Sequence, residues 1–431
     1  MHRVLSFQMG RGFGEPTEFI TKRMCCSLLF SIGFLCLLCG FLIGRFAAGQ
    51  VLEIRAEKKK IELFGNGLES RDYLRNELVQ NLKDSNFTES SLDVRNNKAL
   101  ETVEKSLSGL NIFNKVTGND SCVIATVRGS QEPGITCDKI FMCMYTYRYV
   151  VLGADSENIG IGISIAKAFQ RIYNEHEWIP RRTLIFLISA DYMDSCFNSL
   201  SNYDQSKIVA YLAIDKNPID GDGFFQTSGS DMVLTTVLEA SQDYLTFKNK
   251  NDVKNLQRLK LLIPHTLLSF HRIDNTSALK DNDDINNLHR KNLAQVLSTS
   301  VWRLSEMTIF QWDPLILNTN IKTLNKFDSP DSQVLKDRIK NTIKRIINGG
   351  ILLNKKIDNL DRLKSLDIRM MNDFLKDLEH ALLCPDKNNQ SKTDIALLEQ
   401  QSTVTNNKID DYLQAILACY EDADKILQDM T

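Results

Sequence analysis

The chain lacks a charge imbalance, internal repeats and low-complexity tracts, and these absences narrow the classes of function. Its 52 Lys and Arg nearly cancel its 54 Asp and Glu, which gives a formal net charge of −2. Nucleic acid and other strongly charged partners are therefore not expected. With 431 residues, enough for two or three folded units, the function must come from local features.

Several catalytic and metal-binding signatures are also missing. The sequence has no Gly-x-Ser-x-Gly elbow, no phosphate-binding loop and no His-Glu-x-x-His motif. The six cysteines that follow the first 50 residues are too scattered for a compact zinc knuckle, and they give no basis for pairing any disulfide.

One long hydrophobic run is present. Residues 24–44 contain no charged side chain in 21 positions, and as a helix they would span roughly 31 Å, the thickness of a bilayer core. A cleaved signal peptide has a shorter apolar core, of about 7–15 residues. We therefore predict a transmembrane helix over residues 24–48, preceded by a cytoplasmic tail, 1–23.

The basic residues on the two sides of this run are nearly equal in number, so charge alone does not orient it. All four Asn-x-Ser/Thr sequons follow it, which favours a luminal C-terminal part and a type II glycoprotein of the plasma, secretory or endosomal membranes. The glycosylation candidates are Asn86, Asn119, Asn275 and Asn389. Cys25 and Cys26, beside Lys22 and Arg23, are palmitoylation candidates or small apolar residues in lipid.

The middle of the chain alternates between strand and helix patterns. Residues 122–127, 149–152, 183–188 and 209–214 are short apolar runs typical of strands. Residues 160–172 and 232–245 have helical spacing of apolar positions. This order predicts a parallel or mixed sheet with helices on both faces.

After about residue 310 the period is helical throughout. Three apolar stripes cover residues 334–347, 370–382 and 409–426. The first is expected to stop at Gly349 and Gly350 and the second at Cys384 and Pro385. These patterns predict a helical bundle with long polar links.

Four segments in this order resemble the transferrin receptor and glutamate carboxypeptidase family. They are RYVVLG (148–153), PRRTLIF (180–186), AYLAIDK (210–216) and RMMNDFLKDLE (369–379). The last is similar to the signature helix of the family's dimerisation domain. The resemblance covers residues 120–430 discontinuously, and two departures stand out: no room for a protease-associated (apical) domain, and an additional segment at 134–147.

The resemblance implies an α/β, zinc-aminopeptidase-like three-layer core followed by an α-helical dimerisation bundle. We assign residues 49–118 to a stalk and lead-in segment, 119–310 to the peptidase-like domain and 311–431 to the dimerisation domain. A homodimer through the C-terminal helices is expected, with an unknown protein or peptide ligand. No Arg-Gly-Asp motif, which the transferrin receptor uses for its ligand, occurs here.

The family's two-zinc site needs histidines, carboxylates and a glutamate base. The residues directly after Gly153 include no histidine, and the paired glutamate positions of the family align with Tyr192 and Met193. Asp215 matches a ligand position and is a weak metal candidate, although a strand-end carboxylate can equally cap a turn. No catalytic residue is assigned.

These observations favour a catalytically inactive homologue that acts as a receptor-like or binding protein without a cofactor. The alternative is a zinc-dependent carboxypeptidase or aminopeptidase with displaced ligands, such as Asp155, Asp191, Asp215 and His271. A truncated product, suggested by the missing apical domain, is a third interpretation.

Overall fold

The computed structural model of the chain describes thirteen segments, and the structural statements below concern these alone. They are residues 30–45, 72–83, 97–119, 121–130, 149–155, 158–189, 193–214, 224–242, 263–271, 283–324, 333–360, 365–383 and 406–430. The chain divides into two compact units, residues 1–62 and 63–431.

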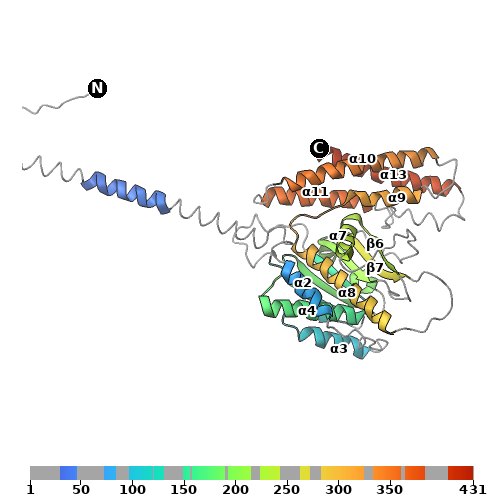
Figure 1. Cartoon of the computed structure of the whole chain (residues 1–431), viewed down its shortest axis with the longest axis horizontal. Coiled ribbons are helices and arrows are strands. Elements are labelled where there is room, and N and C mark those ends of the chain that lie inside the picture. Colours follow the sequence, from blue (N-terminus) through green and yellow to red (C-terminus); the bar gives the residue numbers. More distant parts are fainter. Residues whose placement is uncertain are drawn as a thin grey trace, which may run out of the picture. The chain divides into compact units, whose positions relative to one another are not determined.

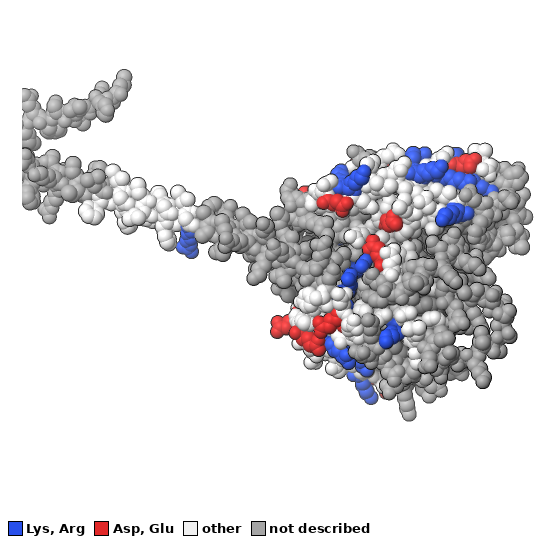
Figure 2. Space-filling model, in the orientation of Figure 1, with Lys and Arg blue, Asp and Glu red and all other residues white. Residues whose placement is uncertain are grey.

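In the first unit, residues 30–45 form a helix with every residue exposed. Its apolar side chains have no packing partner within the described part of the unit, and Phe30, for example, is 80% accessible. Figure 2 shows this helix without charge along most of its length, with a basic side chain at one end. Within the described ranges, no helix combines the length and the apolar character needed to cross a membrane.

The second unit is built on a mixed seven-stranded sheet with the order β1-β2-β4-β3-β5-β7-β6. Strands β4, β3, β5 and β7 are parallel, whereas β1 and β2 on one side and β6 on the other run antiparallel to their neighbours. The strands are β1 Lys115–Gly118, β2 Cys122–Val127, β3 Tyr149–Ala154, β4 Thr183–Ser189, β5 Ile208–Ile214, β6 Phe224–Gly229 and β7 His265–His271.

The predicted strands are confirmed, and their composition explains their place in the sheet. Every residue of β4 and β5 is buried, as expected for continuous apolar runs covered on both faces. Successive side chains alternate between two cores: Val150 and Leu152 belong to the larger one, Val151 to the smaller one.

The larger core is covered by helices α2 (Asp72–Lys83), α3 (Asn97–Ser108), α4 (Ile159–His176), α7 (Asp231–Gln242) and α8 (Asp283–Glu306). The short helix α5 (Met193–Asn198) contributes Cys196 and Phe197 to the core on the other face. The sheet therefore lies between two layers, as predicted; α6 (Asn202–Gln205) buries no residue.

Helices α2 and α3 belong to the folded unit, although residues 49–118 were predicted as a stalk and lead-in segment. Leu78 and Leu82 of α2 and Val103 and Leu107 of α3 are completely buried in the main core. The polar sequences of α2 and α3 do not indicate this burial, because each helix buries only one stripe of leucine and valine.

Helices α10 (Gln333–Asp358), α11 (Ser365–Leu383) and α13 (Asn406–Met430) form the bundle, and α13 packs against the other two (Figure 1). The shorter η2 (Pro314–Leu317) and α9 (Asn318–Leu324) precede them. The prediction that the first bundle helix stops at Gly349 and Gly350 was wrong, because α10 continues to Asp358. Gly350 lies in the helix interior, where an added Cβ would come within 2.7 Å of the Trp312 ring.

Candidate functional site

The topology places the expected ligand crevice at the carboxyl ends of β3 and β5. The chain goes from β3 to its neighbour β4 on one side and then to β5 on the other side. In open α/β sheets, ligands bind where the strand order reverses in this way. The residues that follow β3, β4, β5 and β7 therefore decide what this edge can bind.

Asp155 directly follows β3. Among the residues that the structure describes, it is the carboxylate at this switch point. It is 3% accessible, and its Oδ1 accepts a hydrogen bond of 2.6 Å from the side-chain amide of Asn158. The backbone N–H of Asn158 also donates to the Asp155 carbonyl, and Asn158 precedes the first turn of α4. Asp155 thus helps to form the turn from β3 into α4, a structural use for a carboxylate that was one of the displaced-ligand candidates.

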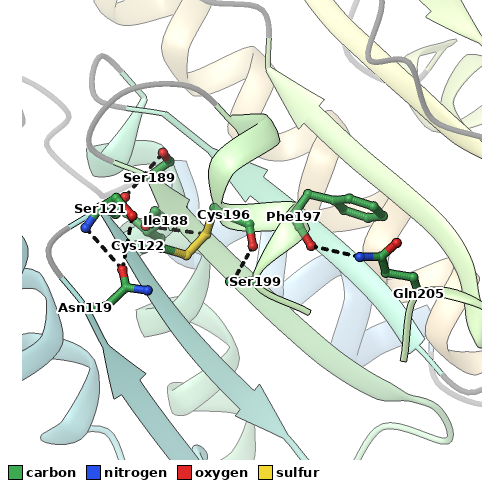
Figure 3. Close-up of a disulfide and its surroundings, with 9 residues drawn as sticks. All are labelled: Asn119, Ser121, Cys122, Ile188, Ser189, Cys196, Phe197, Ser199 and Gln205. Atoms are coloured by element: carbon green, nitrogen blue, oxygen red, sulfur yellow. Dashed lines mark hydrogen bonds between the residues drawn. A yellow bond between two sulfur atoms is a disulfide. The ribbon is translucent and has the colours of Figure 1, made fainter. Parts of the chain in front are cut away.

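A disulfide occupies the edge beyond β4. Cys122, at the start of β2, is bonded to Cys196 in α5, with the two Cα atoms 5.2 Å apart, and both residues are buried. Figure 3 shows the bond beside the end of β4, where the Ser189 hydroxyl donates to the Ser121 carbonyl over 3.4 Å. No local sequence pattern indicates this pairing, because 74 residues separate the two cysteines.

The disulfide ties α5 to the start of β2, beside the end of β4 (Figure 3). Met193, one of the two positions aligned with the family's paired glutamates, opens α5, and a methionine supplies no carboxylate. Tyr192 and Asp191 lie outside the described residues. At its described positions, β4 therefore ends in a serine beside the Cys122–Cys196 disulfide, and neither supplies a general base.

The other predicted metal ligands are only partly described. Asp215 lies outside the described residues. His271 ends β7, which is separated from β3 by β5.

The described residues at this edge do not fit a two-zinc centre. Such a centre needs several imidazole and carboxylate donors converging on one point, and among the described side chains no group of three or more His, Cys, Asp or Glu converges there. Asp155 is the potential metal ligand among the described residues at this edge, and its Oδ1 already accepts a hydrogen bond from Asn158.

Of the predicted modification sites, the structure describes Asn119. It is exposed between β1 and β2, and its Oδ1 accepts hydrogen bonds from the backbone N–H and the hydroxyl of Ser121, the third residue of its own sequon. Glycan attachment is therefore sterically open there. The remaining sites, Asn86, Asn275, Asn389, Cys25 and Cys26, lie outside the described residues.

A buried pair of acids joins the sheet domain to the bundle, and sequence reasoning missed it. Glu379 of α11 is 2% accessible, and its Oε2 accepts a 3.4 Å hydrogen bond from the backbone N–H of Met232, in the first turn of α7. Burial, and to a smaller extent the neighbouring Asp231, raise the pKa of Glu379 to about 8, although hydrogen bonds from Ser230 and Met232 oppose the rise.

Asp231 itself opens α7 and keeps part of its surface accessible, yet burial of its carboxyl group raises its pKa to about 7. Two neighbouring carboxyls in such surroundings cannot both be ionised at neutral pH.

Glu379 and Lys376 also line a small, mainly apolar cavity of about 20 Å3 together with Phe310 and Leu304, which is room for about one water molecule. Glu379 ends the segment 369–379, which resembles the signature helix of the dimerisation domain. Only its tertiary contact with Met232 and Asp231 shows that its carboxyl group is buried and paired with a second acid.

Comparisons with known proteins give distant structural similarity. No family model matches the chain, and no curated protein matches it. Among solved structures, the LapA aminopeptidase of Legionella pneumophila is 13% identical, covering 59% of this chain and 74% of its own, with a TM-score of 0.32. LapB from the same organism is 14% identical, with coverages of 56% and 76% and a TM-score of 0.34.

An aminopeptidase from Aneurinibacillus sp. strain AM-1 is 13% identical, with a TM-score of 0.30. The alignment covers 43% of this chain and 48%, about half, of that enzyme. With TM-scores far below 0.5, these three structures do not indicate the metal, substrate or activity of this chain.

Proposed function

We propose that the chain is a single-pass type II membrane glycoprotein whose folded unit is a non-catalytic, receptor-like binding protein on a peptidase-like α/β core. The observation that carries the proposal is the chemistry of the crevice edge. Among the described residues, the carboxylate Asp155 is hydrogen-bonded into the start of α4, and a disulfide between β2 and α5 lies beside the end of β4 (Figure 3). A scaffold that keeps the sheet but not the donors of a hydrolytic centre favours binding of a protein or peptide over its cleavage.

An activity assay tests the absence of catalysis. The full-length chain, purified in detergent, is incubated with added Zn²⁺ and with substrates that offer a free N-terminal residue or an acidic dipeptide. We expect no turnover above that of buffer with Zn²⁺. Turnover that Asp155→Asn abolishes, with the melting temperature unchanged, would contradict the proposal.

The membrane part of the proposal is supported by the exposed helix 30–45 and by the disulfide. An apolar helix with fully exposed side chains has the surface expected for contact with lipid. Buried disulfides form in oxidising compartments, and Cys122–Cys196 lies in the unit that follows the predicted membrane segment. We infer that this unit is luminal or extracellular and that residues 1–23 are cytosolic.

We also propose a homodimer through the bundle. Leu366 and Met370 are one turn apart on the same side of α11 and are 63% and 62% accessible. Leu352, in the last two turns of α10, is 53% accessible. Large apolar side chains exposed on neighbouring turns of one helix, such as Leu366 and Met370, are typical of interaction surfaces.

The dimer is tested by Met370→Glu, which places a charge on this surface without touching the core. In sedimentation analysis in detergent, the parent chain is expected to be dimeric and the variant largely monomeric, with equal melting temperatures. Asp377→Asn, an exposed position on the same helix, is the matched control. A monomeric parent chain, or a variant that remains dimeric, would refute this interface.

A zinc peptidase with displaced ligands remains the second candidate. It is favoured by Asp155 after β3 and His271 at the end of β7, because the carboxyl ends of parallel strands lie at one edge of a sheet. Asp191 and Asp215 would complete its ligand set. Two bound zinc ions per chain, lost on Asp215→Asn, would establish it in place of the binding protein.

A further inference from the structure

Three metal-ligating side chains converge on the surface where α2 crosses the end of α4. Glu77 of α2 and Glu175 and His176 of α4 place one ligand atom each within 4.8 Å of one another. The His176 Nε2 and a Glu77 carboxylate oxygen are already 2.8 Å apart. In a tetrahedral zinc site with bonds of 2.0–2.1 Å, ligand atoms are about 3.3 Å apart, so small side-chain rotations would bring these three into that geometry.

The packing of the two helices fixes the position of these ligands. Leu74, Leu78 and Leu82 hold α2 in the main core, so Glu77 faces the end of α4 without needing to order a loop. The Tyr73 ring meets the His176 imidazole edge-on, with centroids 5.8 Å apart, which limits rotation of the imidazole. A site that is preformed in this way loses little conformational entropy when a ligand binds.

The charges at this point favour a cation. Two carboxylates share one imidazole, which can neutralise only one of them even when protonated. Arg171, one turn before Glu175, is a cation close enough to act on Glu175, and its guanidinium donates to Asn81 over 3.4 Å. The side chains of His176 and Glu77 are 30% and 33% accessible, which leaves an approach for a hydrated ion and for water as its fourth ligand.

This cluster is remote from the crevice edge. It lies at the carboxyl end of α4, whereas Asp155 precedes the first turn of the same helix. Eighteen residues of α-helix span about 27 Å. A metal ion here therefore has no access to the expected peptidase crevice.

We propose that Glu77, Glu175 and His176 form a surface site for a divalent cation of the zinc type, which fastens α2 to α4. One imidazole with two carboxylates suits Zn²⁺ better than Ca²⁺ or Mg²⁺, which prefer all-oxygen sites. The ion would hold the first helix of the folded unit against the sheet domain. The proposal is independent of the crevice and of whether the chain is catalytic.

The test is a calorimetric titration of the metal-free, full-length chain with Zn²⁺, compared with Glu175→Gln and His176→Gln. Glu177→Gln is the control, because Glu177 is equally exposed and adjacent but is not part of the cluster. We expect a saturable Zn²⁺ site in the parent chain and in the control. Each ligand variant should bind this ion at least about tenfold more weakly.

Thermal unfolding gives a second measurement. Zn²⁺ should raise the melting temperature of the parent chain and of Glu177→Gln but not that of the two ligand variants, because the ion binds only the folded state. Zinc bound by the free thiols of Cys36 and Cys39 would persist in all four proteins. Absence of saturable binding, or binding that both ligand variants retain unchanged, would overturn the proposal.

Discussion

At the residue scale, burial decides how acidic side chains behave in this protein. Glu379 has an ordinary pKa near 4.5 when unfolded and about 8 when folded. The folded state therefore binds the proton more tightly, so this group's contribution to stability is complete below pH 4.5 and is lost as pH rises towards 8. The contact between α11 and α7 should therefore be firmest below about pH 4.5 and should weaken as the pH rises towards 8.

Glu379→Gln tests this pH dependence. Glutamine resembles the protonated carboxyl group, so the variant should lose less stability than the parent chain between pH 5 and pH 8. The difference should be on the order of 1–3 kcal/mol in the free energy of unfolding, measured by urea denaturation. Asp377→Asn, on the exposed side of the same helix, should keep the parent's dependence. Parallel pH profiles for Glu379→Gln and the parent would show that Glu379 ionises normally.

At the scale of single elements, α10 shows why a glycine pair need not end a helix. Glycine lacks the Cβ that would collide with a close neighbour, and Gly350 faces Trp312 and Pro314. Gly349 is less constrained, because an added Cβ there would lie 3.4 Å from the Leu427 side chain. The two adjacent glycines therefore form a matched pair for mutation.

We expect Gly350→Ala to destabilise the chain by about 1–3 kcal/mol, because Trp312 and Pro314 must move. Gly349→Ala should be neutral or stabilise it by up to about 1 kcal/mol through higher helix propensity. Thermal denaturation of the two variants measures both effects. If both alanines stabilise to the same extent, the close packing of α10 on Trp312 is not present.

The disulfide belongs to the same scale, because it joins one strand to one short helix. Replacing Cys122 and Cys196 together by serine releases a loop of 74 residues and should cost about 2–4 kcal/mol of stability. Urea unfolding of the oxidised parent, the reduced parent and the double variant measures the cost. Equal midpoints for all three, or two reactive thiols at these positions in the parent, would contradict the bond.

At the scale of the whole molecule, the proposed membrane orientation makes Asn119 a reporter. The side chain is exposed in the turn between β1 and β2, so a luminal unit would carry a glycan there. Expressed in a secretory system, the parent chain should lose apparent mass with an N-glycosidase, and Asn119→Gln should migrate one glycan lower.

The same preparation tests the anchor. The chain should resist extraction from membranes by alkaline carbonate, and a chain lacking residues 1–48 but carrying a cleavable signal peptide should be released as a soluble product. Asn174→Gln, at a position outside any sequon, is the control for mobility. A parent chain that is unglycosylated and carbonate-extractable would refute both the orientation and the anchor.

The sequence by itself determined strands β2 to β5, helices α4 and α7 and the three long helices of the bundle, because their apolar periods are strong and local. Residues 183–188 and 209–214 could hardly be anything but buried strands, and the apolar stripe of residues 409–426 lies within α13. The sequence also showed that the glutamate positions of a two-zinc site are not kept, because Tyr192 and Met193 carry no carboxylate in any fold.

Tertiary structure alone decided which distant residues meet. Cys122 and Cys196, Glu379 and Asp231, and Glu77 and His176 are each separated by more than 70 residues, and no local pattern links them. The same holds for Gly350, whose role depends on the Trp312 ring, and for α2, whose burial depends on α4 and α8. Local periodicity fixes which face a residue occupies, whereas the neighbours on that face are set by packing of the whole chain.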